Sequence, residues 1–130
     1  MAKTTNDLKI AVRRTFDCST VHITAEDRDL LNVSSLASLP HLDDISNVTE
    51  GMWNAASNYP GIVYGHETGW FVYTGSSDED GYQSRLRRMR AVGYSDAMID
   101  LMVIARSNDC VFIALDRDGH TYDELPQFDW

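Results

Sequence analysis

The residues best placed to do chemistry follow the last apolar run of the chain, residues 110–115. Asp116 and Asp118 belong to the pattern D-x-D-G-x-T, which comes directly after this run. A carboxylate at the end of a buried strand can act as a nucleophile, as a general acid or base, or as a metal ligand. His22 is the other candidate, because an imidazole exchanges protons near neutral pH. In an enzyme, we expect His22, Asp17, His66 and the turn of Asp116 and Asp118 to come together at strand ends, with His22 and Asp116 in one pocket.

The same D-x-D-G-x-T pattern has a structural interpretation. Phosphatases of the haloacid dehalogenase type carry a similar sequence, but at the start of a longer domain that also needs a Lys and a second acidic loop downstream. Only nine residues follow Thr121 in this chain, and none of them is Lys. The spacing of a calcium loop is missing as well. We therefore favour a turn that ends a strand, in which Asp116 or Asp118 caps backbone amides and Gly119 takes a positive φ.

Other residues that could form a catalytic or metal site are few. A histidine just before a helix cap, as His22 is, more often bonds to its local surroundings. Cys18 and Cys110 lie in or beside predicted strands, which favours buried free thiols over a disulfide or a metal site. The chain has four histidines and carries no C-x-x-C, H-E-x-x-H, G-x-S-x-G or P-loop pattern. We expect no metal and no cofactor, and we favour a non-enzymatic protein over an enzyme.

Composition predicts one folded domain. The 130 residues are 43% hydrophobic and 10% aromatic, which suits a single core over residues 1–130, with the polar residues 1–8 frayed. No apolar run approaches the roughly 18 residues of a membrane span, and no signal-peptide pattern begins the chain. We expect a cytoplasmic protein that does not contact membranes.

The charge of the chain predicts a class of partner. Twenty acidic against eleven basic residues give a formal charge of −9 and an isoelectric point near 4.6. Such a charge disfavours direct binding of nucleic acid and favours a basic protein surface, although acidity for solubility alone stays an alternative. The candidate partner-binding residues are two acidic clusters and two aromatics: Asp43, Asp44, Asp78, Glu79, Asp80, Trp70 and Tyr73.

The order of the predicted elements indicates an α+β fold, with helices packed on a mixed sheet of about four strands. We expect the first and last strands to be neighbours at the centre of this sheet, and the last strand to be buried on both faces. Residues 38–60 are poorly readable beyond a helix starting near Pro40. The other expected elements are a strand over 10–17, a helix capped at Thr24 and running through Leu36, a hairpin of strands 62–64 and 70–73 with loop 65–69, an acidic linker 75–81, helices over 82–93 and 95–105, and a strand over 110–115.

Side-chain spacing assigns faces to several elements. Tyr82, Leu86 and Met89 share one side of a helix, whereas its arginines spread around the remaining circumference and favour a solvated surface over a nucleic-acid stripe. The hairpin aromatics occupy both faces, so either both faces are covered or one aromatic row is an exposed contact surface. Phe128 and Trp130 at the acidic tail are expected to dock on the body near the last strand.

Three segments resemble a small uncharacterised bacterial family found on plasmids and prophages, often near anti-restriction genes. They are C-S-T-V-H-I-T-A-E-D at 18–27, G-W-F-V-Y at 69–73, and L-D-R-D-G at 115–119 continuing through L-P-Q-F-D-W at 125–130. The family carries no assigned activity and no catalytic residues to transfer. The resemblance implies a mobile-element setting.

These observations lead to one leading hypothesis and two alternatives. The leading hypothesis is an acidic inhibitor that binds a bacterial defence effector, of anti-CRISPR or anti-restriction type, and blocks its basic nucleic-acid-binding surface. One alternative is a small enzyme that uses His22 and the turn of Asp116 and Asp118. The other is an antitoxin-like or immunity-like binding protein.

Overall fold

The computed structural model describes residues 12–37, 63–74 and 79–130. The expected frayed start, the helix expected near Pro40, and the site candidates Asp43, Asp44 and Asp78 lie outside these residues. In chain order the described elements are β1 (Arg14–Ser19), the short 3-10 helix η2 (Thr20–His22), α1 (Ala25–Ala37), β2 (Val63–His66), β3 (Gly69–Tyr73), α3 (Glu79–Val92), α4 (Asp96–Ser107) and β4 (Cys110–Asp116).

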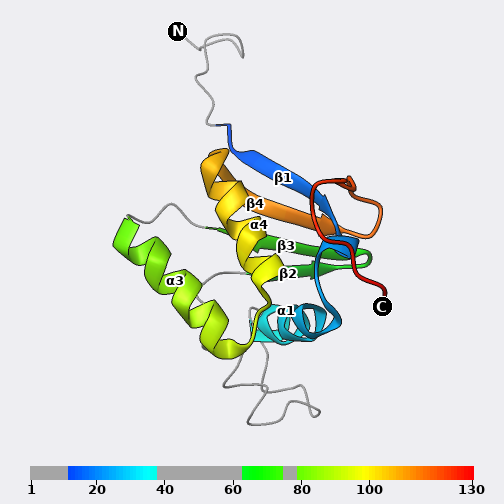
Figure 1. The fold of residues 1–130 in the computed structure, drawn as a ribbon, viewed down its shortest axis with the longest axis horizontal. Helices are drawn as coiled ribbons and strands as arrows, with labels where there is room; N and C mark the ends of the chain where they lie inside the picture. The colour runs from blue at the N-terminus through cyan, green and yellow to red at the C-terminus, as the bar shows by residue number, and fades with distance from the viewer. Residues whose placement is uncertain (1–11, 38–62, 75–78) are drawn as a thin grey trace, which may run out of the picture.

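The strands form one mixed sheet in the order β1-β4-β3-β2 (Figure 1). Strand β4 runs parallel to β1 and antiparallel to β3, which pairs antiparallel with β2. The expected α+β fold with four strands is confirmed. The first and last strands are neighbours, as expected, but β1 lies at an edge of the sheet. The central pair is β4 and β3, because the β2–β3 hairpin occupies the side of β4 that β1 leaves free.

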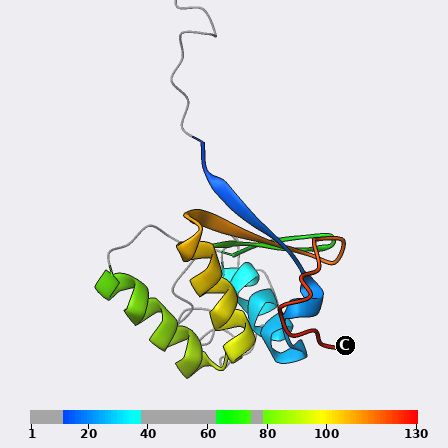
Figure 2. The ribbon, with the colours of Figure 1, turned by 45° about the horizontal axis from the view of Figure 1, so that its top comes forward.

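The helices α1, α3 and α4 lie on the same face of the sheet (Figure 2). Their presence explains the burial along β4, where Ile113 and Leu115 are fully buried but Phe112 and Ala114 are only half-buried. The expectation that β4 is buried on both faces is therefore wrong. Successive side chains of a strand point to opposite faces, and the described helices cover only one.

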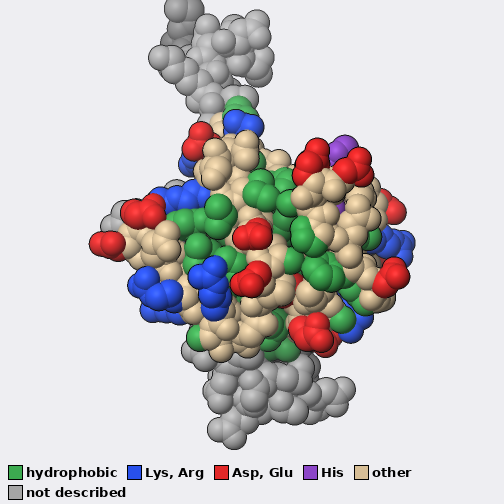
Figure 3. All heavy atoms as spheres, in the orientation of Figure 1, with side chains coloured by type: hydrophobic (Ala, Val, Ile, Leu, Met, Phe, Trp, Pro, Cys, Tyr) green, Lys and Arg blue, Asp and Glu red, His purple; other side chains and the backbone are tan. Residues whose placement is uncertain are grey.

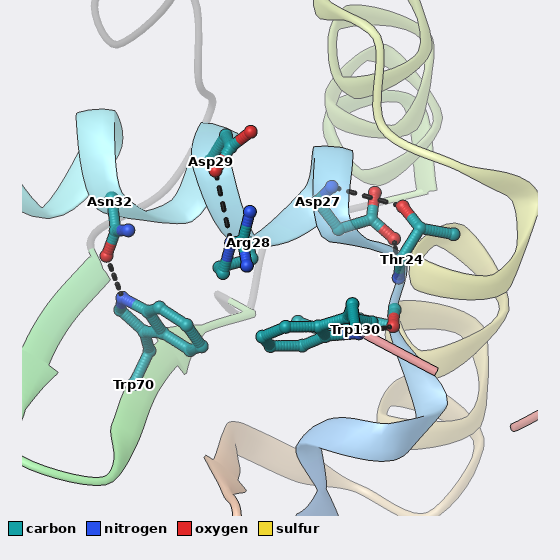
Figure 4. Close-up of polar contacts among 8 residues, drawn as sticks. Thr24, Asp27, Arg28, Asp29, Asn32, Trp70 and Trp130 are labelled. Atoms are coloured by element: carbon teal, nitrogen blue, oxygen red, sulfur yellow. Dashed lines mark hydrogen bonds and ion pairs between the residues drawn. The ribbon is translucent and has the colours of Figure 1, made fainter. Parts of the chain in front are cut away.

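Two helices begin with the caps that the sequence predicts. The Thr24 hydroxyl accepts from the Asp27 amide at 3.1 Å, and the Asp27 carboxylate accepts from the Thr24 amide at 3.0 Å. This reciprocal pair starts α1 (Figure 4). Ser95 caps α4 by accepting from the Met98 amide at 3.1 Å. Asp27 also accepts from the Ser95 amide at 2.8 Å, so one buried carboxylate joins the starts of two helices.

The buried faces of α3 and α4 follow the predicted spacing. Tyr82, Leu86 and Met89 are buried on α3, and Gly93 ends this helix with φ 118°. Five residues are buried on α4, which makes it the most apolar of the described helices: Met98, Ile99, Leu101, Met102 and Ala105. The acidic linker expected over 75–81 is wrong for residues 79–81, which form the first turn of α3, where acidic side chains face the positive end of the helix dipole.

The β2–β3 hairpin is confirmed, but its loop is shorter than expected. Residues 65, 66 and 69 belong to the strands, and the turn consists of Glu67 and Thr68. Gly69 lies so close to β4 that a Cβ atom there would collide with the carbonyl oxygen of Leu115. This glycine serves close strand packing and not loop flexibility.

Both cysteines are buried free thiols, as expected. Desolvation, together with the neighbouring Asp17 carboxylate, raises the pKa of Cys18 to about 12. The thiol therefore stays protonated and packs as a small apolar side chain. Among the helices of residues 12–37 and 79–130, none combines the length and the apolar character that crossing a bilayer requires.

Candidate functional site

His22 is committed to holding the C-terminal tail. The side chain is 1% exposed, and its Nε2 accepts from the Tyr122 amide at 2.9 Å. The ring proton therefore lies on Nδ1, which donates to the carbonyl oxygen of Pro126 at 2.7 Å. Both nitrogens have backbone partners. The sequence favoured a local hydrogen-bonding role over a catalytic one, but the partners of His22 are not local: they lie 100 and 104 residues further along the chain.

Asp116 is held in the turn that follows β4. Its Oδ1 accepts from the Asp118 amide at 2.9 Å, and its Oδ2 accepts from the Thr68 hydroxyl at 2.9 Å. These two hydrogen bonds lower the pKa of Asp116 below its usual value. Asp118 contributes its amide to this turn, and its own carboxylate is exposed. The capping expected of Asp116 is observed, but the positive φ expected at Gly119 is wrong, because among the described glycines only Gly93 has one. Gly119 instead serves close packing, since a Cβ atom there would lie 2.7 Å from the carbonyl oxygen of Cys18.

The contacts of Asp116 lead through Thr68 to His66, whereas those of His22 lead to the C-terminal tail. His66 Nδ1 accepts from the Thr68 amide at 3.3 Å, and the Thr68 hydroxyl lies 3.4 Å from the same nitrogen while donating to Asp116. The Arg117 amide also donates to the Thr68 carbonyl at 2.9 Å. This cluster ties the hairpin turn to the turn after β4. Thr68 had no signal in the sequence, because its role depends on which strands pair.

Two clefts lie on the described surface, and neither is lined by His22, Asp116 or Asp118. The smaller, of about 330 Å³, lies beside the hairpin turn and includes Trp70 and Trp130 in its walls. Over residues 12–37, 63–74 and 79–130, no three His, Cys, Asp or Glu side chains are placed to hold a metal ion. The predicted pocket shared by the three polar candidates does not form at these two clefts.

Trp70 belongs to the core side of the sheet. Only 9% of the residue is exposed, and its indole N–H donates to Asn32 on α1 at 3.2 Å. Figure 4 shows its ring beside that of Trp130, over which the Arg28 guanidinium lies at 4.9 Å. Trp70 was predicted to bind a partner, but because it is buried, a partner could reach it only through the smaller cleft that it lines.

The tail docks on η2 and the start of α1. The Phe128 amide donates to the Val21 carbonyl at 2.7 Å, and the Trp130 indole donates to the Ile23 carbonyl at 2.8 Å. Trp130 nevertheless remains 47% exposed. Docking on the body was expected. The hydrogen bonds of the tail go to η2 and the residue after it, and Trp130 also lines the smaller cleft beside Arg117, which follows β4.

The opposite face of the sheet carries a row of aromatic side chains. We call Tyr64, Phe71, Tyr73 and Phe112 the outer aromatic face. Tyr64 pairs across the strands with Phe71, and Tyr73 pairs with Phe112, with ring centroids 5.4 Å apart. Tyr64 is 53% exposed and Phe71 is 44% exposed. Of the two arrangements that the sequence left open, the exposed aromatic row is the one observed among the described residues.

Carboxylates lie at the margins of the outer aromatic face. Phe71 is opposite Ala114, which is opposite Asp17 on β1, so an exposed acid ends the row that Tyr64 begins. Asp116 lies on the same side of β4, two residues beyond Ala114. Aromatic faces beside carboxylates suit basic side chains, through cation–π contacts and charge attraction. The sequence did indicate two different faces on β3, because successive residues of a strand, such as Trp70 and Phe71, point to opposite sides of the sheet.

The acidic candidates at the start of α3 are exposed but partly engaged within the chain. Glu79 accepts from Arg106 at 3.2 Å and from Gln83 at 3.0 Å. Asp80 is exposed beside it. On the helix-covered face, basic side chains gather over α3, and acidic ones are spread over the rest of the face (Figure 3). This face therefore presents both signs of charge.

Comparisons with known proteins match one family. A family model described as "Family of unknown function (DUF5983) C-terminal domain" matches residues 15–130. No curated protein and no solved structure matches the chain. The matched span includes every element of the sheet and the tail that His22 holds.

Proposed function

The chain belongs to the DUF5983 family of unknown function, and we propose that it is a non-enzymatic acidic inhibitor encoded by a mobile element. In this proposal it acts in the cytoplasm of a bacterial cell. It binds a defence effector of anti-CRISPR or anti-restriction type and covers the basic surface that the effector uses for nucleic acid.

The observation that carries the proposal is the outer aromatic face. Tyr64 and Phe71 are adjacent across two strands and each is about half exposed. Large aromatics are among the residues that contribute most to binding energy at protein interfaces. The four residues of this face come from three strands of one sheet, so their positions are fixed by backbone pairing before any partner binds. Such preorganisation lowers the entropic cost of association.

Charge supports a basic partner. The chain carries a formal charge of −9, and Asp17 extends from the same side of the sheet as the aromatic row. A surface evolved to bind phosphates is rich in Lys and Arg, which pair with carboxylates and stack on aromatic rings. The resemblance of residues 18–27 and 115–130 to a plasmid and prophage family supports a defence effector as the owner of that surface.

Affinity capture from a bacterial lysate tests the proposal. The immobilised full chain should retain a nucleic-acid-binding defence complex, identified by mass spectrometry, and this retention should weaken as salt is raised over the range that shortens the Debye length from about 10 to about 3 Å. The variant Y64S/F71S should lose the complex. The matched control D100N removes a charge from the helix-covered face and should retain it.

Infection assays supply the functional measurement. Cells that carry an active defence system and express the chain should be infected by a targeted phage more efficiently than cells that express Y64S/F71S. Capture of a small toxin instead of a defence complex would replace the proposal with the antitoxin-like alternative. Equal capture by the wild type and by Y64S/F71S would remove the outer aromatic face as the interface.

A further inference from the structure

Over the described residues, backbone hydrogen-bonding groups along the outer edge of strand β1 have no partner. In the described sheet, β1 is an edge strand paired with β4. In a parallel pair, alternate residues point both their N–H and C=O groups away from the neighbour. Two contacts identify these residues: the Ser19 amide donates to the His120 carbonyl at 2.8 Å, and the Asp17 carbonyl accepts from the Tyr122 hydroxyl at 2.8 Å. By the same alternation, both backbone groups of Thr15 and the Asp17 amide point outward.

The tail of the chain contacts one end of this edge through a single backbone hydrogen bond, from the Ser19 amide to the His120 carbonyl. His120 itself belongs to no strand. Among the described residues, no backbone partner bonds to the outward groups of Thr15 or to the Asp17 amide. This part of the edge is therefore open over the described residues.

A groove of about 500 Å³ runs beside the same stretch of β1. Apolar side chains form part of its lining. Two of them, Tyr122 and Phe16, contact each other edge to face, with ring centroids 5.6 Å apart. The charged residues of the lining are the exposed carboxylates Asp17 and Glu124 and one basic residue, Arg14. The apolar lining residues are Phe16, Ile104, Cys110, Tyr122 and Leu125.

We propose that the edge of β1 is a strand-addition site for an extended peptide with alternating apolar and basic side chains. The peptide backbone pairs with the outward groups of Thr15 and with the Asp17 amide. Its apolar side chains enter the groove beside Phe16 and Leu125, and its basic side chains lie near Asp17 and Glu124. This binding mode combines backbone hydrogen bonds for affinity with side-chain pockets for specificity. The edge of β1 and the outer aromatic face meet at Asp17, but the variants that test the two proposals change different residues, so either proposal can fail without the other.

The test uses fluorescein-labelled peptides of about nine residues, the length of a long strand. One probe alternates valine and lysine, and its control alternates serine and lysine. Fluorescence anisotropy with the full chain should show tighter binding of the valine probe. Hydrogen exchange should show slower exchange of the Thr15 and Asp17 amides when that probe is added. Equal binding of both probes, or protection confined to other amides, would overturn the proposal.

Variants of the edge make the test specific. Thr15→Pro removes one outward N–H without removing a bond to β4, and it should weaken the valine probe about tenfold, the equivalent of one backbone hydrogen bond. Glu124→Lys reverses an exposed charge of the groove, should weaken the probe by a similar factor, and covers the case in which T15P fails to fold. The control Asp100→Lys makes the same kind of charge change on α4 and should bind normally. Unchanged affinity in E124K, or an equal loss in D100K, would contradict the site.

Discussion

Two of the polar side chains that could have done chemistry have their hydrogen-bonding groups occupied within the fold. His22 bonds to the backbone through both ring nitrogens, and Asp116 accepts two hydrogen bonds through its two oxygens. His22 is buried, so it can leave these partners only at a cost in stability, because buried polar groups left unpaired are destabilising. At the residue scale, these groups act as ties between segments that are far apart in the sequence.

The stability of the protein should decrease at low pH in part because of Asp116. Its pKa in the folded state is lowered from 3.8, first by the hydrogen bond from the Asp118 amide and then by that from Thr68. The stabilising contribution is therefore fully present above pH 3.8 and is lost as the pH falls through the lower folded-state value. We expect Asp116→Asn to lower the melting temperature at neutral pH and to reduce its fall on acidification below about pH 4.

Thermal melts of the wild type and D116N across this pH range provide the measurement. Asp123→Asn is the matched control, since it neutralises an exposed tail carboxylate for which no hydrogen bond appears among the described residues. Parallel pH curves for the wild type and D116N would show that Asp116 does not contribute to acid sensitivity.

At the scale of elements, Asp27 joins the starts of α1 and α4. The residue is fully buried and its carboxylate accepts from Thr24 and from both the amide and the hydroxyl of Ser95. We expect Asp27→Ala to destabilise the protein by about 3 kcal/mol, because several buried donors lose their acceptor at once. Urea unfolding measures this loss. Asp29→Ala, which breaks only the exposed ion pair with Arg28, should cost less than about 1 kcal/mol. Equal losses would contradict the role of Asp27.

The tail is held on the body by hydrogen bonds to His22, Val21 and Ile23. Deleting residues 126–130 removes the Phe128 and Trp130 hydrogen bonds and the carbonyl that His22 contacts. Both aromatics are only partly buried, so we expect a loss of a few kcal/mol and a melting temperature lower by roughly 5–10 °C. Differential scanning calorimetry measures the change. A truncated chain that melts like the wild type but no longer captures its partner would show that the tail belongs to the interface instead.

The helices could be predicted from the sequence because their signals are local. Thr24 and Ser95 precede apolar periodicity, and Gly93 follows it, so caps and faces lie within a few residues of one another. The hairpin followed from the same kind of local evidence. Its turn was misjudged because Gly69 marks a close approach to β4, which is 46 residues away from it at Leu115. Glycine alone does not distinguish a loop from tight strand packing.

Long-range pairing set the limit of prediction for the sheet and for the site. That β1 takes an edge, and that Thr68 reaches Asp116, depend on strand order, which the local pattern does not encode. The capping role of Asp116 was predictable because its amide partner is two residues away. The outer aromatic face could be predicted only in part. The alternation of side chains along β3 places Phe71 and Trp70 on opposite faces of the sheet, but which face is buried depends on where the helices pack.

At the scale of the whole molecule, substitutions in the outer aromatic face should impair partner binding without impairing folding stability. Tyr64 on β2 and Phe71 on β3 are about half exposed, whereas Val72, the neighbour of Phe71 on β3, is fully buried. We expect Y64S/F71S to change the unfolding free energy less than Val72→Ala, which leaves a cavity under the helices and should cost about 2 kcal/mol.

A folded monomer rarely keeps adjacent large aromatics in water without a binding role. The two variants should therefore have opposite phenotypes: Y64S/F71S stays folded and loses partner capture, and V72A melts early but captures the partner below its melting temperature. Chemical denaturation and affinity capture on the same protein preparations measure both properties. If Y64S/F71S unfolds as readily as V72A, these aromatics serve the fold, and the interface must be sought elsewhere on the chain.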